Sequence, residues 1–305
     1  MTQLTRRQAL AATASLPLAS ALPGLAAAEA PLLGPSFARH RRFTLGAFEV
    51  TTILAGTRPV EDPQTIFGTN VSREDFVAVS DAHFLSPDVT QFFFTPVVVN
   101  TGSELVLFDT GLNAAGTVTA LAEAGYTADQ IDTVVLTHMH GDHIGGLQTP
   151  QGPTFPNASY ATGQIEFDSW ASAGNDNFEA AVRPLADRMT FLDDGDRVVR
   201  GITGEAAFGH TPGHMVFRIE SDNEQLLITG DLANHAVWSL ANPDWQVRFD
   251  ADAAAAALSR RRILDMLATD RIPAAFYHLP FPAIGFVEAD RGNFRFVPEA
   301  GQLVG

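Results

Sequence analysis

The sequence predicts a mixed α/β fold in which two β-sheets pack together and helices cover the outside. The first observation is that strand-like and helix-like segments alternate along the chain, which is typical of this fold class. The second is size, because 305 residues of which 46% are hydrophobic suffice for a large buried core. Residues 29–305 contain no repeats and no linker, so we expect a single domain.

Strands are expected where apolar residues alternate or where β-branched residues run together between turn signals. The segments of this kind are residues 43–54 (a hairpin), 94–100, 104–109, 131–137, 215–220 and 225–229. Residues 56–90 mix turn signals with apolar residues instead. They predict a long loop with one short helix near residues 72–79, and loops of that length are usually functional or mobile.

Helices are expected at residues 114–124, 164–170, 178–189 and 252–268. Gly125 ends the first of them. The last is the clearest, because it is rich in alanine and carries Arg260, Arg261 and Arg262 toward its C-terminal half, where the helix dipole favours cations.

Residues 1–28 predict an export signal and not a part of the fold. Arg6 and Arg7 resemble the pair of a twin-arginine signal, and a weakly apolar stretch rich in alanine and leucine follows them. Ala26-Ala27-Ala28 offers the small residues that a signal peptidase cleaves after. We therefore expect a periplasmic or secreted protein that is exported in folded form, with a single mature domain over residues 29–305.

The net charge and the cysteine content of the chain exclude several classes of function. The chain has 35 acidic and 19 basic residues, a net charge of −16, and such a surface repels nucleic acid and anionic membranes. Nucleic-acid binding and stable membrane insertion are therefore not expected. The absence of cysteine excludes disulfides and thiolate metal ligands.

The most informative stretch is His138-Met139-His140-Gly141-Asp142-His143, directly after the predicted strand 131–137. Alternate side chains of an extended segment share a face, so His138 and His140 can reach one metal ion. Asp142 and His143, after the turn that Gly141 permits, can point at a second ion nearby. Neutral imidazole and carboxylate are the ligands that zinc and its neighbours take.

This stretch resembles the signature of the metallo-β-lactamase superfamily, H-x-H-x-D-H followed by a distant His, Asp and His. The resemblance implies a four-layer αββα sandwich and two divalent metal ions. It assigns the later ligands to His214 in Phe208-Gly209-His210-Thr211-Pro212-Gly213-His214, Asp231 after Leu226-Leu227-Ile228, and His278 in Tyr277-His278-Leu279-Pro280. One ion would then be bound by His138, His140 and His214, the other by Asp142, His143 and His278, with Asp231 as the bridge.

The resemblance also implies the chemistry. Two divalent ions, Zn²⁺ first and Mn²⁺, Co²⁺ or Fe²⁺ as alternatives, would hold a bridging hydroxide that attacks an ester, lactone or phosphotriester. Asp142 and Asp231 are the carboxylates expected to take part in catalysis. Asp109 is expected to orient a ligand imidazole from outside the site, and His210 to lie beside the ligands or to be structural.

Within the superfamily the chain resembles methyl parathion hydrolase and related secreted organophosphate hydrolases or esterases. The resemblance rests on residues 43–50, 136–140, 209–214, 278–285 and 294–298, of which the last two segments discriminate best because the metal motif is shared by every branch. Gly141 and Phe286 depart from the pattern of that branch, and residues 58–93 match it poorly. We therefore expect this chain to share the fold and the metal chemistry of that branch, whereas the resemblance is a weaker guide to its substrate. The lack of cysteine also sets the chain apart from zinc β-lactamases that use a Cys ligand.

Aromatic residues near the expected metal site are candidates for a substrate pocket, namely Phe94, Trp170 and Phe281. Apolar walls suit a small neutral or apolar ester-type substrate. A lactonase of acyl-homoserine lactones is the alternative within this class, and a homodimer is left open. An iron-dependent oxidoreductase, such as a persulfide dioxygenase, is the alternative from another class. A non-catalytic exported binding protein is disfavoured because no expected ligand is missing.

Overall fold

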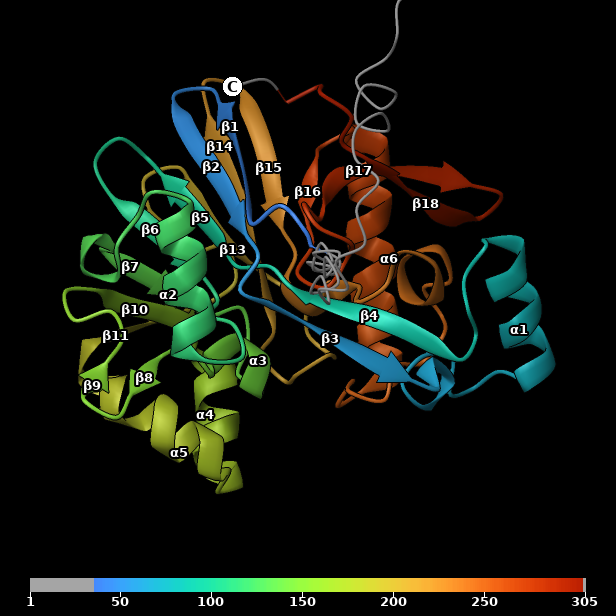
Figure 1. The fold of residues 1–305 in the computed structure, drawn as a ribbon, viewed down its shortest axis with the longest axis horizontal. Helices are drawn as coiled ribbons and strands as arrows, with labels where there is room; N and C mark the ends of the chain where they lie inside the picture. The colour runs from blue at the N-terminus through green and yellow to red at the C-terminus, as the bar shows by residue number, and fades with distance from the viewer. Residues whose placement is uncertain (1–35, 304–305) are drawn as a thin grey trace, which may run out of the picture. The chain divides into compact units, whose positions relative to one another are not determined.

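Two seven-stranded β-sheets form the centre of the fold (Figure 1). The structure is a computed structural model that describes residues 36–303, and the described residues from Phe37 onward form one compact unit. The strand order of the first sheet is β1-β2-β5-β6-β7-β10-β11. Its strands are β1 (His40–Leu45), β2 (Phe48–Ile53), β5 (Val97–Asn100), β6 (Leu105–Phe108), β7 (Thr133–Val135), β10 (Ser159–Gly163) and β11 (Met189–Leu192).

The second sheet contains the C-terminal strands in sequence order, β12 to β18. They are β12 (Arg197–Val199), β13 (Ile202–Ala206), β14 (Met215–Ser221), β15 (Glu224–Ile228), β16 (Ala274–Ala275), β17 (Ile284–Asp290) and β18 (Asn293–Pro298). Neighbouring strands of this sheet are antiparallel except β15 and β16, which run parallel.

The alternation of apolar side chains explains why the two sheets pack face to face. In β5, Val97 and Val99 point into the core between the sheets, whereas Val98 points to the outer face. In β14, Phe217 belongs to the same inter-sheet core and its neighbour Val216 to the other side. Each strand thus contributes to two cores, because successive side chains point to opposite faces.

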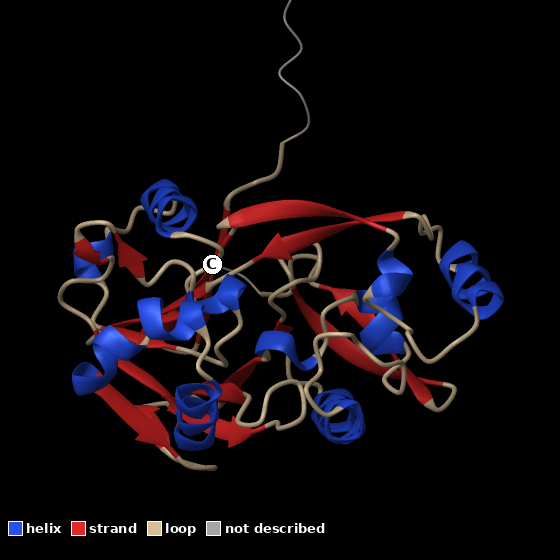
Figure 2. Cartoon of the chain, turned by 90° about the horizontal axis from the view of Figure 1, so that it is seen from below, coloured by secondary structure: helices blue, strands red, loops and turns tan. Residues whose placement is uncertain are grey.

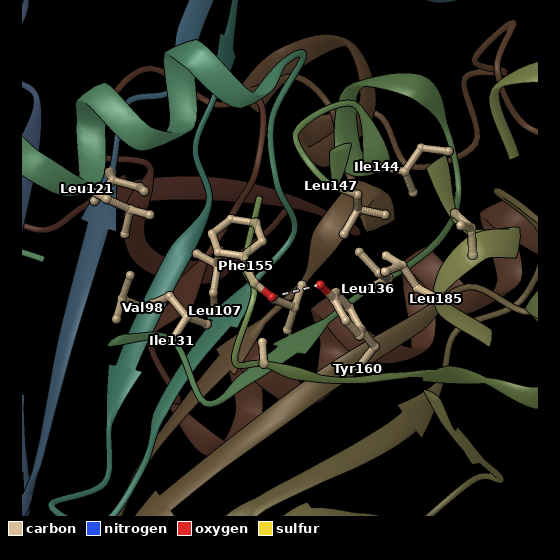
Figure 3. Close-up of a cluster of buried hydrophobic side chains, with 14 of the residues drawn as sticks. Val98, Leu107, Leu121, Ile131, Leu136, Ile144, Leu147, Phe155, Tyr160 and Leu185 are labelled. Atoms are coloured by element: carbon tan, nitrogen blue, oxygen red, sulfur yellow. Dashed lines mark hydrogen bonds between the residues drawn. The ribbon is translucent and has the colours of Figure 1, made fainter. Parts of the chain in front are cut away.

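Helices cover both outer faces, so the four-layer αββα sandwich expected from the sequence is confirmed. The outer face of the first sheet packs against α2 (Ala114–Glu123), α4 (Gln164–Ala173) and α5 (Asp176–Ala181). Figure 3 shows this core, where Val98 and Leu107 of the sheet meet Leu121 of α2. The second sheet packs against α6 (Ala253–Asp270), whose N-terminus is capped by the side chain of Asp252.

The short helix expected near residues 72–79 is confirmed as α1 (Arg73–Ala82), but the expectation that the rest of residues 56–90 is a loop was wrong. That region forms a separate two-stranded arm, hereafter the β3–β4 arm, of β3 (Gly56–Glu61) and β4 (Val89–Phe94), with η1 (Pro63–Thr65) and α1 between them. Figures 1 and 2 show α1 at the far end of this arm. The sequence hides β3 because most of its side chains are exposed and Pro59 interrupts it, so no apolar period marks the strand.

The helix expected over residues 178–189 is also shorter than predicted. It ends as α5 at Ala181 and continues as the 3₁₀ helix η3 (Arg183–Arg188), because Pro184 cannot donate the hydrogen bond that a continuous α-helix needs. The remaining short elements are η2 (Ala128–Gln130), α3 (Gly141–Ile144), β8 (Gln148–Thr149), β9 (Gly152–Pro153), η4 (Gly230–Leu232) and the π-helix η5 (Ala236–Ala241).

The expected export signal over residues 1–28 lies outside the part of the chain that the structure describes. Within residues 36–303, no helix has both the length and the apolar character that a membrane span requires.

Candidate metal centre

The candidate metal centre lies where parallel strands end. Asp109 directly follows β6, and His138 comes three residues after the parallel strand β7. In the second sheet, Asp231 follows β15 and His278 follows its parallel neighbour β16. The carboxyl ends of neighbouring parallel strands meet at the same edge of a sheet, which is where α/β proteins place their ligand sites. The fold therefore brings together side chains that are far apart in sequence.

The first group of possible ligands consists of His138, His140, His210 and Asp231. Nδ1 of His140 lies 3.0 Å from Nε2 of His138 and 3.0 Å from Nε2 of His210, and the latter two atoms are 3.3 Å apart. Oδ2 of Asp231 lies 3.2 Å from Nε2 of His210. Ligand atoms about 2.0–2.1 Å from a tetrahedral zinc ion are about 3.3 Å from one another, so these separations fit one ion.

The second group consists of Asp142, His143 and His278. Nε2 of His278 lies 3.3 Å from Oδ2 of Asp142. Oδ1 of Asp231 completes this group, because it lies 3.2 Å from Nε2 of His143 and 3.2 Å from Nε2 of His278. The two oxygens of Asp231 thus face different groups, Oδ2 the first and Oδ1 the second, which is the geometry of a bridging carboxylate.

Hydrogen bonds outside the site fix how the imidazoles point. Nδ1 of His143 donates to Oδ2 of Asp109 over 2.8 Å, as the sequence analysis expected of Asp109. Nδ1 of His278 donates to the carbonyl of Phe93 (2.9 Å), and Nδ1 of His210 to Oδ1 of Asp250 (2.9 Å). Since each ring uses its outer nitrogen as a donor, Nε2 is the nitrogen that faces the site and can bind a metal ion once it carries no proton.

Burial and charge together set the pKa values of these groups. Burial lowers the pKa of His140 to about 4, and the positive charge of His210 lowers it in the same direction. For His210 and His278, burial also lowers the pKa, but neighbouring carboxylates, above all Asp231, raise it to about 9. Burial alone would raise the pKa of Asp142, yet His143 and His278 bring it down to about 2.

Orphaned polar atoms show that the donor set fits metal ions. Nε2 of His143 and Oδ1 of Asp231 are buried and have no hydrogen-bond partner, although they are 3.2 Å apart. Buried polar atoms normally have a partner, because leaving one unpaired costs about 1–3 kcal/mol. A cation bound between them would satisfy both. All ligand atoms are imidazole nitrogen or carboxylate oxygen, which suits Zn²⁺, Mn²⁺, Co²⁺ or Fe²⁺.

The structure corrects one predicted ligand. His210 lies among the ligand atoms of the first group, whereas His214 does not belong to either group. Nε2 of His214 accepts a hydrogen bond from the backbone N–H of Asp231, and its Nδ1 lies 3.2 Å from the carbonyl of Ala207. Both ring nitrogens of His214 are therefore engaged. The two histidines are four residues apart in one motif, so the sequence pattern alone did not separate them.

A pocket of about 320 Å³ opens onto the two groups. Its described walls include His140, Asp142, Asp231 and His278, together with the non-ligand side chains of Arg58, Phe92, Phe94, Leu112 and Phe249. The predicted pocket residue Phe94 is thus in place. The sequence analysis missed Arg58, Leu112 and Phe249. No local signal marks them, because the β3–β4 arm and irregular chain segments carry them.

The other two predicted pocket residues lie elsewhere. The ring of Trp170 is 5.7 Å from that of His140, but its Nε1 donates to Glu166 (2.7 Å) and it does not line the pocket. Phe281 is also absent from the pocket walls, so this expectation was wrong. The chain reverses there, with the N–H of Ala283 donating to the carbonyl of Pro280 (2.9 Å), and this turn takes Phe281 away from His278.

Comparison with known families decides the classification. The family model of the metallo-beta-lactamase superfamily matches residues 95–275, more than half of the chain. The chain belongs to the metallo-β-lactamase superfamily. Among curated members, it is 29% identical over 137 residues to the lactamase-like protein nscB of Neosartorya fischeri and 32% identical over 139 residues to the lactamase-like protein vrtG of Penicillium aethiopicum. Each alignment covers 44% of this chain, and only 36% and 38% of these relatives.

Solved structures of the superfamily align over much more of the chain. AidC, a dizinc quorum-quenching lactonase in complex with its product N-hexanoyl-L-homoserine, superposes with a TM-score of 0.78 at 27% identity, covering 86% of this chain and 98% of AidC. The hydrolase AbOPH superposes with a TM-score of 0.77 at 24% identity, covering 87% and 99% of the two chains. The likeness to AbOPH, at that identity, supports the fold alone.

Proposed function

We propose that this superfamily member is a dinuclear metal-dependent hydrolase that cleaves the ester bond of a lactone or a related carboxylic ester. The observation that carries the proposal is the division of Asp231 between two ligand groups, with one oxygen 3.2 Å from His210 and the other 3.2 Å from His143 and His278. A carboxylate placed in this way suits two ions about 3.5–4 Å apart. We further propose Zn²⁺ as the native ion, with Mn²⁺, Co²⁺ or Fe²⁺ as substitutes.

In this proposal, the metal ligands and the pocket walls contribute to different parts of the hydrolysis. When bound, the two ions supply a hydroxide nucleophile at neutral pH and a Lewis acid for the substrate's carbonyl oxygen. Asp109 and Asp250 hold the rings of His143 and His210 in the required orientation. Phe92, Phe94, Leu112 and Phe249 provide the apolar walls that exclude water and bind the hydrocarbon part of the substrate.

The order of preference among substrates is lactone, then carboxylic ester, then phosphotriester. Similarity to the lactonase AidC at 27% identity over 86% of the chain favours the first. The relation to the methyl parathion hydrolase branch is retained as a finer proposal, and it rests chiefly on the segments 278–285 and 294–298. The pocket walls suit the hydrocarbon part of all three substrate classes, so assays must include each of them.

We also keep the proposals that residues 1–28 direct export in folded form to the periplasm or medium and that the remainder is one hydrolase domain. Replacing Arg6 and Arg7 by Lys should then trap the precursor in the cytoplasm. Unchanged delivery would show that the pair is incidental.

The test of the proposed function is a substrate panel on metal-analysed protein. p-Nitrophenyl esters, acyl-homoserine lactones and a neutral phosphotriester are offered to protein that carries about two ions per chain, with Asp231→Ala as the inactive control. We expect turnover of lactones or esters that disappears in the variant. Protein with two bound ions that hydrolyses none of these compounds, but consumes oxygen with a persulfide, would replace the proposal by the oxidoreductase alternative.

A further inference from the structure

We propose that Arg58 is a specificity-determining residue that binds an anionic group of the substrate. The substrate class is then an ester or lactone that carries a carboxylate at a distance from the bond to be cleaved. This inference rests on the proposed function and narrows the substrate that the sequence analysis expected to be neutral or apolar.

Arg58 lies on the wall of the pocket that contains the candidate metal centre. It belongs to β3 of the β3–β4 arm, where it pairs with Phe92 of β4. The same pocket is lined by the possible metal ligands His140, Asp142 and His278. A substrate whose scissile bond sits at these ligands therefore has Arg58 within the same enclosure.

One aromatic ring lies beside the exposed side chain of Arg58. Cζ of Arg58 lies 6.0 Å from the centre of the Phe94 ring, at the limit of a cation–π contact. The Phe94 ring in turn packs edge-on against His278, with 5.4 Å between ring centres. The Phe94 ring thus lies beside both the charge of Arg58 and a possible metal ligand, and the pocket that these residues line has room for a substrate.

The guanidinium of Arg58 has no partner of its own. Neither a hydrogen bond nor an ion pair joins its side chain to any residue in the range 36–303. Other arginines do pair with carboxylates, for instance Arg73 with Asp88 (2.6 Å) on the same arm and Arg260 with Asp250 (3.1 Å). Arg197, Arg200, Arg248 and Arg271 also lack such partners, but among the described arginines it is Arg58 that lines the pocket. Its planar fork is free to bind a carboxylate through two hydrogen bonds.

The remaining pocket walls are apolar, so the charge of Arg58 can distinguish an anionic substrate from a neutral one. Apart from Arg58, the possible metal ligands and Gly141, the described residues that line the pocket are Phe92, Phe94, Leu112 and Phe249, all apolar. A neutral polar substituent would gain little from these walls. A carboxylate would find in the exposed side chain of Arg58 the single cationic group among the described pocket walls, and a charge-assisted hydrogen bond to it is worth about 1.5 kcal/mol, or roughly tenfold in affinity.

Two p-nitrophenyl esters that differ only at the end of the acyl chain test the proposal. One acyl chain ends in a carboxylate and the other in a carboxamide, so leaving group and length are matched. We expect the wild-type enzyme to have a KM at least about tenfold lower for the carboxylate ester. Arg58→Gln should abolish this preference, because it should raise KM for the anionic ester about tenfold more than KM for the neutral ester. Arg58→Lys should keep part of the preference.

Arg197→Gln serves as the matched control, because Arg197 is an exposed arginine on β12 outside the pocket and its replacement removes the same charge. A binding measurement accompanies the kinetics. Calorimetry compares the dicarboxylate product with its half-amide, which share the carboxylate formed by hydrolysis. The dicarboxylate should bind more tightly to the wild type and to Arg197→Gln, but not to Arg58→Gln.

The two proposals fail in different ways. Equal KM values for both esters in the wild type, or an equal effect of Arg58→Gln on both, would overturn the role of Arg58 and leave the hydrolase intact. Failure of the metal-loaded wild type to cleave either ester, together with the lactones and the phosphotriester, would overturn the proposed function. The calorimetric comparison of the dicarboxylate with its half-amide then shows, without any turnover, whether the pocket binds an anionic group.

Discussion

The backbone N–H of Asp231 donates a hydrogen bond to Nε2 of His214 over 3.1 Å. Because of this contact, His210 and His214, which belong to one sequence motif, have different roles. Gly230, at φ +49°, makes it feasible, because a Cβ at that position would lie 2.9 Å from the same nitrogen of His214. His214 therefore holds the backbone of Asp231 in place, whereas Nε2 of His210 faces the side-chain oxygen Oδ2 of Asp231 within the site.

The first prediction follows from this division of roles. His210→Ala removes a ligand atom of the first group and should lower the bound metal by about one ion per chain. His214→Asn should keep both ions, but lower the free energy of unfolding by about 1–3 kcal/mol, because the buried N–H of Asp231 loses its acceptor. Metal analysis after dialysis and chemical denaturation measure the two effects.

His83→Ala is the control for this pair, because His83 is exposed near the end of α1 and belongs to neither ligand group. It should leave metal content and stability unchanged. Loss of an ion from His214→Asn with retention of both in His210→Ala would restore the ligand assignment expected from the sequence.

The second prediction concerns the two ligand groups. Asp231→Ala should weaken binding of both ions, since Oδ1 and Oδ2 face different groups. His278→Ala should chiefly weaken the ion held by Asp142 and His143, leave about one ion per chain, and reduce turnover strongly because positioning and charge stabilisation fail together. Metal titration followed by assay of the same sample distinguishes the variants. Full turnover of His278→Ala with two ions would refute the assignment of His278.

The third prediction concerns a buried ion pair behind the site. Nη2 of Arg260 lies 3.1 Å from Oδ2 of Asp250, the other oxygen of which accepts the hydrogen bond from His210. Both side chains are almost fully buried. Arg260→Ala leaves the Asp250 charge unpaired and should cost about 3–5 kcal/mol in the free energy of unfolding. Arg262→Ala, an exposed neighbour on α6, should change it by less than about 0.5 kcal/mol. Urea denaturation measures both, and equal losses would contradict the role of the pair.

How much of this site the sequence could predict depends on how local each contact is. His138, His140, Asp142 and His143 fall within six residues after a strand, so their spacing alone indicated two ligand pairs. The choice between His210 and His214 depends on Asp250, which lies 40 residues further along the chain, and no spacing rule contains that contact.

The pocket was harder to predict than the ligands. Arg58 lies on a strand whose side chains are mostly exposed, so it has no apolar period to recognise. The sheets were easier, because alternation such as that of Val97, Val98 and Val99 is set by the two cores on either side of β5.

The last prediction concerns proton release on metal binding. Burial would lower the pKa of His210 and His278, but Asp231 and the other nearby carboxylates raise it to about 9 for both. In chelator-treated protein at pH 7 both rings are therefore protonated, and a metal ion can bind Nε2 only after the proton has left. When both sites are loaded at pH 7, His210 and His278 should each release about one proton, and the contribution of these two rings should fall toward zero as the pH rises past 9.

The raised pKa of these two rings also affects the stability of the metal-free protein. The pKa of each ring is raised on folding from 6.5 to about 9, so the stabilisation it gives is fully present below pH 6.5 and is lost as the pH rises through 9. Chelator-treated protein should therefore become less stable between pH 6.5 and 9, whereas the loaded protein should not lose this contribution because its rings carry no proton. Calorimetry in two buffers of different ionisation enthalpy counts the protons, and thermal unfolding across the pH range follows the stability. Metal binding at pH 7 without proton release would show that His210 and His278 are neutral before the ions bind.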